Sequence, residues 1–496
     1  MNIEFLGFSL EFILLFSSSL LVISVLLSRV SSTLGVPALL IFLVLGMLAG
    51  SEGLGKIPFD NYSIAFAIGS VCLAFIVFDG GLRTSWVSVK PILPIGISLS
   101  FFGTIITGIV TGIFAHLVLG LGLLEGLLLG GISSSTDAAA VFSILRSKGL
   151  SLKGKLKQIL EFEAGSNDPV AVFFTIAMIS IISSASTNAA SVFWLFLKQA
   201  GIGFIFGYIG ANAIRVITNR AGIEFEGLYG VLIAGFVMVL FSGTSYVGGS
   251  GFLAVYVAGL LLGKFDFLHK GSVTRFVDGV AWVSQITIFL VLGLLVFPSK
   301  ILLVWKEGLL FAFFMMFIAR PISVFLSAPG KTLKKEERLF VSWIGLRGAA
   351  PIILATLPWI KKLPNAEFYF DLVFFTVIIS VVFQGISIPW IASKLKVTVP
   401  IDEESQADSN LGSLLPPGFI SIEAVVHEGA NATDKKIFEL GLPPGVLLTS
   451  IKRGDRFLVP QGSTTVVTGD KVLGFARESS LEELKLIFGD TKKVVT

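Results

Sequence analysis

The stretch EFEAGSNDPV, residues 161–170, carries acidic and amide side chains inside a long apolar run that continues to Ile182. An ionised side chain at the centre of a membrane helix costs about 2.5–3.5 kcal/mol on insertion scales, so such residues usually face a cavity and serve a function. These groups could also only hold helices together, but Asn-Asp-Pro with a second acid one turn earlier favours a functional site. The stretch therefore predicts a helical membrane protein with a polar site at membrane depth.

The side chains of this stretch form a set of hard oxygen ligands. Glu163 and Asn167 are four residues apart and share a helix face, and Asp168 is close enough in angle to border the same cavity. Pro169 has no N–H, so the carbonyl of Gly165 lacks its helical partner and can face a cation. A carboxylate, an amide oxygen and a free carbonyl suit an alkali ion or a proton.

The composition of the chain excludes a soluble protein. Of its 496 residues 54% are hydrophobic and 14% are charged, and the mean hydropathy is +0.89. These values are typical of a protein that crosses the membrane many times and is embedded in lipid. The single Cys72 and three dispersed histidines exclude a disulfide framework and a zinc spacing. The net charge of +4 arises in loops between helices and indicates no nucleic-acid partner.

Thirteen apolar segments have the length of a membrane-spanning helix, or nearly so. They cover residues 9–28, 34–50, 62–78, 92–119, 123–145, 157–183, 192–213, 228–242, 245–263, 280–297, 308–326, 338–357 and 369–392. Most basic loop residues follow odd-numbered segments, and the positive-inside rule places these loops in the cytoplasm. We therefore expect a multi-pass protein of the inner (plasma) membrane, with its N-terminus outside and its C-terminal tail inside. The first run lacks a preceding basic region, which indicates a retained helix rather than a cleaved signal peptide.

The fifth segment contains residues that interrupt a helix, which in transporters marks a binding site. Gly130 and Gly131 weaken the helix, and the polar run 133–137 can satisfy an unwound backbone. Asp137 is then expected at the start of a second half-helix, where a carboxylate meets the positive end of the helix dipole.

The twelfth segment is interrupted in a similar way. Gly345, Gly348 and Pro351 break it, and Arg347 between them is expected to neutralise the negative end of the first half-helix. The broken segment is the fifth of six in both halves of the chain, and the two halves start on opposite sides of the membrane. The fold class predicted is a polytopic α-helical membrane protein with two inverted six-helix repeats and crossed broken helices.

The composition changes after Lys396, which marks the end of the membrane domain. We assign residues 1–397 to the membrane domain, 398–415 to a polar linker and 416–496 to a small cytoplasmic α+β domain. Strands are expected at Phe419–Val426, Val446–Ile451, Arg456–Val459 and Lys471–Ala476, and helices at Asp434–Leu440 and Ser480–Phe488. The tail has no GxGxxG followed by an acid, so we expect neither NAD nor another cofactor.

Motifs from both parts of the chain resemble those of known families. The membrane motifs are Thr136-Asp137, Glu163 with Asn167-Asp168, and Gly345-Leu346-Arg347-Gly348-Ala349. As a set they resemble the sodium/proton exchanger family, in its NhaP-like, electroneutral branch, over about residues 5–395. The tail motifs Leu442-Pro443-Pro444-Gly445, Val459-Pro460-Gln461-Gly462 and Gly469-Asp470 resemble the TrkA-C (RCK-C) regulatory domain, over about residues 416–490. The pairing resembles bacterial potassium/proton antiporters of the cell-volume-regulation type.

The resemblance implies roles for the residues of the ion site. Asp168 would carry the cation and the proton in turn, with Asn167 beside it. Thr136 and Asp137 would border the site where the broken helices cross, and Thr136 would join Asp168 in holding the transported cation. Ser166 is a further candidate, although it lies on another face of the helix.

The resemblance also implies a structural ion pair and a homodimer. Glu163 would pair with Arg347 and hold the core of the protein together. Sodium-exchanging relatives usually have Ser directly after this glutamate, where the present chain has Ala164. This difference favours potassium over sodium as the cation.

The predicted activity is electroneutral exchange of one K+ or Na+ for one proton, which is transport rather than enzymatic catalysis. Two alternatives use the same scaffold: a ligand-gated cation channel, since such tails also regulate channels, and a sensor that has lost transport. The inverted halves with broken helices disfavour the channel, and the intact Asp168 and Arg347 disfavour the sensor. The tail is expected either to bind a small ligand, such as a nucleotide, at a dimer interface or only to dimerise.

Overall fold

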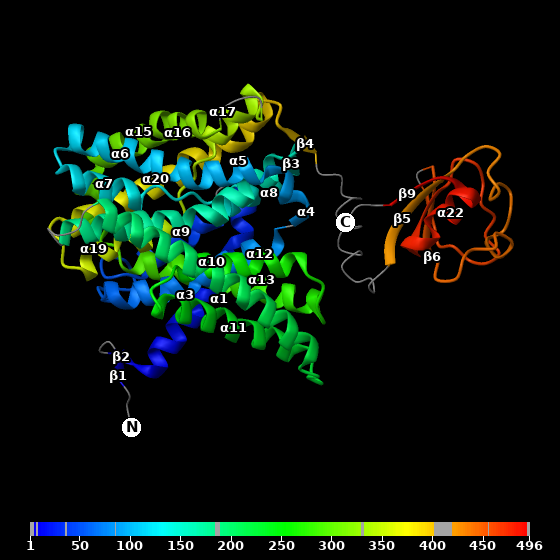
Figure 1. The fold of residues 1–496 in the computed structure, drawn as a ribbon, viewed down its shortest axis with the longest axis horizontal. Helices are drawn as coiled ribbons and strands as arrows, with labels where there is room; N and C mark the ends of the chain where they lie inside the picture. The colour runs from blue at the N-terminus through cyan, green and yellow to red at the C-terminus, as the bar shows by residue number, and fades with distance from the viewer. Residues whose placement is uncertain are drawn as a thin grey trace. The chain divides into compact units, whose positions relative to one another are not determined.

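The computed structural model describes residues 4–5, 8–34, 37–84, 86–183, 189–328, 332–400, 419–454 and 456–493. Contacts within the chain divide it into two compact units, Met1–Pro400 and Ile401–Thr496. The first unit is a helical body and the second is built around a small sheet (Figure 1). The acidic residues predicted to mark the linker, Asp402, Glu403, Glu404 and Asp408, lie outside the described residues.

The helical body consists mainly of long apolar helices. These are α1 (Leu10–Leu34), α3 (Tyr62–Arg83), α9 (Leu156–Ser183), α10 (Ala189–Arg220), α11 (Gly227–Tyr246), α13 (Lys270–Leu294) and α20 (Ala366–Lys394). Shorter helices are α2 (Ala38–Ala49), α4 (Trp86–Val89), α12 (Gly251–Lys264) and α19 (Leu357–Ile360). Two short hairpin strands, β1 (Glu4–Phe5) and β2 (Phe8–Ser9), precede α1.

Two further spans are assembled from successive helical pieces. One runs through η1 (Lys90–Ile92), α5 (Leu93–Ile97), η2 (Ser98–Gly103) and α6 (Thr104–Leu119). The other runs through α14 (Pro298–Ile301), η3 (Leu302–Val304), α15 (Trp305–Phe314), η4 (Met315–Ala319) and α16 (Arg320–Ser327). Both contain a π-helical turn, η2 in the first and η4 in the second. Such turns often occur at functional sites.

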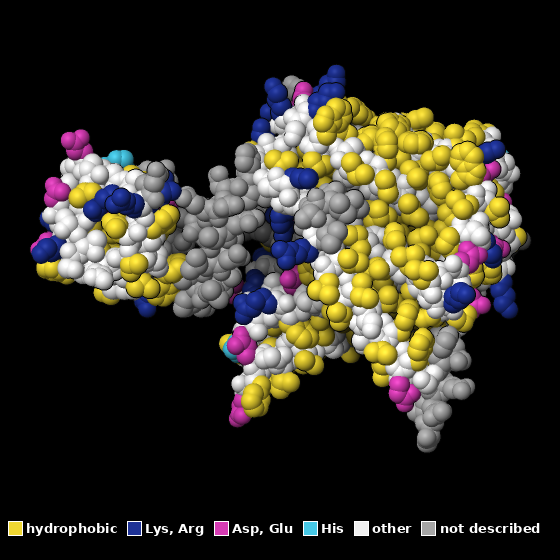
Figure 2. All heavy atoms as spheres, turned by 180° about the vertical axis from the view of Figure 1, so that it is seen from behind, with side chains coloured by type: hydrophobic (Ala, Val, Ile, Leu, Met, Phe, Trp, Pro, Cys, Tyr) yellow, Lys and Arg dark blue, Asp and Glu magenta, His cyan; other side chains and the backbone are white. Residues whose placement is uncertain are grey.

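The number of membrane-crossing segments agrees with the sequence prediction. Among the described residues, nine helical stretches are long and apolar enough to span a membrane, and four shorter apolar helices occupy the remaining predicted segments. Figure 2 shows a broad band of hydrophobic side chains over the helical body, with charged side chains gathered toward its ends. This distribution is the one expected of a body surrounded by lipid.

Both predicted helix interruptions are present. The first separates α7 (Leu123–Ile132) from α8 (Ala139–Ser147), and the second separates α17 (Lys335–Trp343) from α18 (Ala349–Ala355). The two interruptions contact each other, because the N–H of Asp137 donates to the carbonyl of Leu346 at 2.7 Å. Close packing of α7 against α9 and of α18 against α7 brings both interruptions to the helix that carries residues 161–170.

The second unit contains a five-stranded antiparallel sheet in the order β7-β6-β8-β5-β9. Its elements are β5 (Phe419–Val426), η5 (Ile437–Glu439), β6 (Leu447–Arg453), β7 (Arg456–Leu458), β8 (Lys471–Arg477), η6 (Glu478–Ser480), α22 (Leu481–Phe488) and β9 (Gly489–Lys493). Leu484 and Phe488 of α22 are fully buried in the core that the sheet forms. The four predicted strands and the last helix are confirmed, whereas the helix predicted at Asp434–Leu440 is wrong and only η5 forms there.

Candidate functional site

Asp168 is the central carboxylate of the site. It lies on α9 facing the first interruption, and the hydroxyl of Ser135 donates a hydrogen bond to its Oδ1. The side chain is 9% exposed, so the carboxylate is largely removed from bulk solvent. Burial disfavours the charged form of a carboxyl group, while a hydroxyl donor or a bound cation favours it. Asp168 is therefore a buried carboxyl group that has one hydroxyl donor, Ser135, to its Oδ1.

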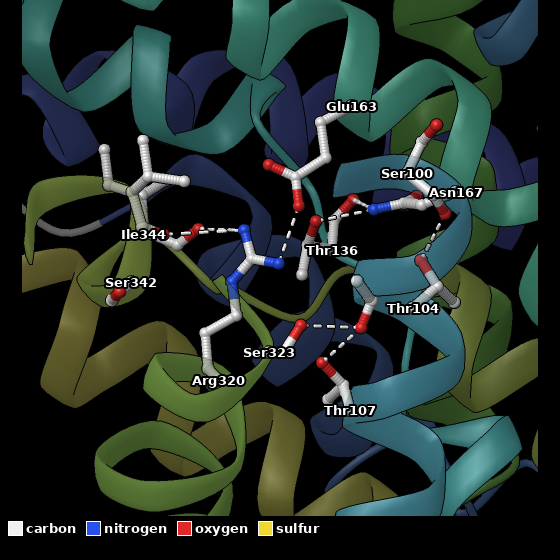
Figure 3. Close-up of polar contacts among 12 residues, drawn as sticks. Ser100, Thr104, Thr107, Thr136, Glu163, Asn167, Arg320, Ser323, Ser342 and Ile344 are labelled. Atoms are coloured by element: carbon white, nitrogen blue, oxygen red, sulfur yellow. Dashed lines mark hydrogen bonds and ion pairs between the residues drawn. The ribbon is translucent and has the colours of Figure 1, made fainter. Parts of the chain in front are cut away.

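Asn167 and Thr136 form the second contact between α9 and the first interruption. The amide nitrogen of Asn167 donates to Oγ1 of Thr136 at 2.6 Å and to its carbonyl at 3.4 Å (Figure 3). The amide oxygen of Asn167 is buried and has no hydrogen-bond partner among the described residues. An unpaired buried oxygen costs free energy, and a cation without its hydration shell could satisfy it.

Asp137 is held at the start of α8, as the sequence predicts. Its Oδ1 accepts a hydrogen bond from the N–H of Ala139 at 2.8 Å. A Cβ atom at Gly348 would lie 2.7 Å from Oδ2 of Asp137, so only glycine allows the second interruption to approach this closely. The carboxylate of Asp137 thus accepts a hydrogen bond at the N-terminal end of α8 and borders the crossing of the two broken helices.

Arg347 reaches across the crossing to the other broken helix. Its Nη1 donates to the carbonyls of Ser134 and Ser135, both at 2.6 Å, just beyond the C-terminal end of α7. Its own N–H donates to the hydroxyl of Ser380 on α20 at 3.1 Å. We predicted that Arg347 neutralises the negative end of α17, the first half of its own broken helix. The structure corrects this prediction, because Arg347 donates to carbonyls that follow α7, the first half of the other broken helix.

The predicted pair between Glu163 and Arg347 is also corrected. Glu163 Oε1 accepts from Nη1 of Arg320, on α16, at 2.6 Å, and both side chains are fully buried (Figure 3). Nη2 of Arg320 lies 3.4 Å and 3.5 Å from the carbonyls of Val341 and Ile344, at the C-terminal end of α17. Arg320 therefore neutralises both Glu163 and the end of α17, the two roles that we had assigned to Arg347.

Comparisons with known proteins cover most of the chain. The profile of the sodium/hydrogen exchanger, transmembrane family matches residues 19–394, and that of the TrkA-C domain matches residues 422–489. The chain belongs to the sodium/hydrogen exchanger family. It is 40% identical to the K(+)/H(+) antiporter NhaP2 of Shewanella sp. strain ANA-3, over 98% of this chain and 85% of the relative. It is 37% identical to the K(+)/H(+) antiporter NhaP of Alkalimonas amylolytica, over 94% and 82%.

A solved exchanger structure has the same fold. The sodium proton antiporter MjNhaP1 from Methanocaldococcus jannaschii matches with a TM-score of 0.67 and 24% sequence identity. The match covers 76% of this chain and all of that chain. The helical body is therefore an antiporter fold, with the tail as an additional unit.

Ser166 is not hydrogen-bonded to any other predicted site residue that the structure describes. It lies on α9 two residues before Asp168, and among the described residues no hydrogen bond joins it to Asp168, Thr136 or Asp137. An open pocket of about 740 Å3 has Lys300 and Asp371 in its lining, but none of the predicted site residues contributes to it.

Sequence reasoning missed three residues that complete the site of this exchanger. Ser135 donates to Asp168, Arg320 pairs with Glu163, and Gln384 supports the second interruption by donating to the carbonyl of Trp343 at 2.7 Å. Arg320 carried a signal, because it is a lone charge inside an apolar segment. Ser135 lies in the polar run 133–137 that predicted the first interruption, but nothing in that run identified it as the residue that donates to Asp168. Gln384 has no feature in the sequence that separates it from other polar residues of the helices.

Proposed function

We propose that this chain exchanges a monovalent cation for a proton across the membrane, and that both bind Asp168 in turn. The observation that carries the proposal is the position of Asp168. It is a buried carboxylate on an unbroken helix, and it accepts a hydrogen bond from Ser135. It lies where the interruptions of the two broken helices meet. Membership of the sodium/hydrogen exchanger family supports the same activity.

Competition at one carboxylate explains how the exchange is coupled. When Asp168 is protonated it attracts no cation, and when a cation is bound the charged form is stabilised and the proton is excluded. If the site changes sides only when one or the other is bound, each cation moved must be balanced by one proton. Asn167 beside it adds an oxygen but no second titratable charge, which supports exchange without net charge movement.

We infer that K+ is the cation. Relatives that are 37–40% identical over nearly the whole chain are named K(+)/H(+) antiporters. The presence of Ala164 where sodium-exchanging relatives usually have serine supports the same choice. The cation ligands proposed are Asp168 and Thr136. Asn167 and Asp137 border the site, and Ser166 is a further candidate.

We further propose that the protein is a homodimer in the plasma membrane, with its N-terminus outside and residues 416–496 in the cytoplasm. The distribution of basic loop residues supports this orientation. The TrkA-C match supports a regulatory role for the tail, either by binding a small ligand such as a nucleotide or by dimerisation alone.

The test is a flux assay with purified protein in liposomes. A series of Li+, Na+, K+ and Rb+ should drive proton release without net current, with K+ the most effective cation. Asp168→Asn should lose this exchange and still purify as a folded protein. Glu161→Gln is a matched control, since Glu161 lies two turns earlier on α9 and pairs with Lys157 at 3.8 Å. Uncoupled current would favour the channel alternative, and no flux of any kind would favour the sensor.

A further inference from the structure

A short pair of strands joins the ion-site helices to the start of the tail. β3 (Leu150–Leu152) follows α8, and β4 (Thr398–Pro400) follows α20. The strands are antiparallel, with Leu150 opposite Pro400, Ser151 opposite Val399, and Leu152 opposite Thr398. They lie together at the end of the helical body where α8 also lies (Figure 1). We call β3 and β4 together the strand bridge.

The strand bridge is reinforced by contacts at one end. The N–H of Lys153 donates to the carbonyl of Val397 at 2.8 Å, and its Nζ donates to the carbonyl of Lys396 at 3.0 Å. Leu152 and Val397 are buried in the core of the helical body, 7% and 4% exposed. The bridge is thus anchored by packing as well as by backbone hydrogen bonds.

The chain changes direction sharply where the strands of the bridge meet the helices. Gly149 and Gly154, on either side of β3, have φ of +66° and +59°, and Lys396, before β4, has φ of +56°. These left-handed residues make sharp turns rather than continuing a helix or strand. β3 is therefore a separate short element between α8, the second half of the first broken helix, and α9, which carries Asp168.

The position of β4 makes the strand bridge the part of the helical body that is nearest to the tail along the chain. The second unit begins at Ile401, directly after β4. β4 pairs with β3, and β3 packs against both α8 and α9. These two helices carry Asp137 and Asp168, the two carboxylates at the crossing.

We propose that the strand bridge is the element through which the C-terminal unit regulates exchange at Asp168. This inference rests on the proposed antiport function. When the bridge is paired, the ends of α8 and α9 are held in one position; when the tail withdraws β4, these ends are released. A two-stranded pair of three residues is only marginally stable by itself, so a modest bias from the tail can shift its pairing even though Leu152 and Val397 anchor one end.

The test uses the full-length chain in liposomes and weakens the bridge at one residue. Val399→Pro removes a backbone N–H from β4, whereas Val399→Thr keeps the backbone and the side-chain shape and is the matched control. A second perturbation acts inside the tail: Asp470→Asn weakens the pair with Arg453, whose two nitrogens donate to the carboxylate at 2.9 Å and 2.8 Å. The readout is the rate of K+-driven proton release and its pH profile.

Val399→Pro and Asp470→Asn should each change the rate about fivefold or more, and the double variant should match Val399→Pro alone. Val399→Thr should behave as the unaltered chain. A disulfide formed by Ser151→Cys with Val399→Cys should fix the rate and make it insensitive to Asp470→Asn until it is reduced. The proposal is overturned if Asp470→Asn leaves the rate of exchange unchanged. It is also overturned if the double variant changes the rate by the product of the two single effects. Absence of exchange in the unaltered chain would overturn the proposed function instead.

Discussion

Glu163 and Arg320 form a fully buried ion pair, with 2.6 Å between Oε1 and Nη1 and side-chain exposures of 2% and 3%. The pair joins α9, which carries Asp168, to α16, which follows the π turn η4. Because Arg320 also faces the carbonyls of Val341 and Ile344, it connects α9 to the second broken helix. The pair therefore fixes α9, the helix that carries Asp168, relative to the crossing of the broken helices.

Removing either partner of this pair should destabilise the protein strongly. A lone charge left in the interior typically costs about 3–5 kcal/mol. Glu163→Gln and Arg320→Gln should each lower the thermal unfolding midpoint in detergent, and the double variant should lose clearly less than the sum of the two. The same cycle with Arg347→Gln in place of Arg320→Gln is the control and should show a smaller coupling. Equal couplings for the two arginines would contradict the assignment of Arg320 as the partner.

The choice between the two arginines shows where sequence reasoning reached its limit. Arg320 lies in the apolar segment 308–326, so the cost of a charge at membrane depth marks it as functional, just as it marks Glu163. The π turn η4 directly precedes it. A π turn adds a residue and shifts the face of later side chains by about 100°. No helical pattern in the sequence predicts that shift, nor which helix packs against α9.

The interruptions of the broken helices were predictable because glycine, proline and polar residues act locally. The helix predicted at Asp434–Leu440 does not form because contacts with a distant part of the chain decide the structure there. The N–H groups of Asp434 and Ile437 donate to the carbonyls of Val466 and Thr464, so contacts with another segment replace helical bonds. β9 was missed because its sequence GDTKK is polar; it pairs with β5 at the edge of the sheet, where charged residues are common.

Ser135 should set the pH range of exchange through its hydrogen bond to Asp168. A donor to a charged group contributes about 1.5–3 kcal/mol, and it favours the charged carboxylate over the protonated form. Ser135→Ala removes this support, so protons compete better and the pH midpoint of exchange should move about one unit or more toward alkaline values. The measurement is the rate of K+-driven proton release from pH 6 to 9. Ser180→Ala, about three turns after Asp168 on α9, is the control and should leave the midpoint unchanged. A midpoint that stays in place in Ser135→Ala would show that the bond is not made in the working protein.

Gly348→Ala should disturb the crossing of the broken helices. The added Cβ would lie 2.7 Å from Oδ2 of Asp137, which is closer than van der Waals contact allows. Overpacking of this kind costs about 1–3 kcal/mol, and here it also displaces a residue beside the ion site. We expect a lower unfolding midpoint and a several-fold loss of exchange. Gly80→Ala is the matched control because nothing lies within 4 Å of its added Cβ. An equal effect of the two substitutions would refute the close approach.

Proton and cation should compete visibly if Asp168 binds both. Where the carboxylate is mostly protonated, each unit rise in pH should lower the apparent KM for K+ about tenfold, because ten times fewer protons compete. At higher pH the apparent KM should reach a constant value. The maximal rate at saturating K+ should depend on pH much less than the KM does. Independent binding of proton and cation would instead give a KM that does not change with pH.

The tail should change the rate of exchange without changing which cation is preferred. The proposed ion-site residues Thr136, Asn167 and Asp168 all belong to the unit Met1–Pro400, so every proposed ligand of the cation lies outside the tail. The tail has its own ion pair, between the buried Asp470 and the partly exposed Arg453, and the hydrogen bonds that Arg453 donates to Asp470 hold the pKa of its guanidinium above its ordinary value.

A chain that ends at Pro400 keeps the strand bridge and every proposed ligand, so its ranking among Li+, Na+ and K+ should equal that of the full chain. Its rate or pH profile should differ, because a regulatory unit shifts activity only through its bias between active and inactive states. The comparison requires both chains in liposomes at several pH values. A reordered ranking would mean that the tail shapes the ion site itself, and selectivity would then have to be sought in the second unit as well as around Asp168.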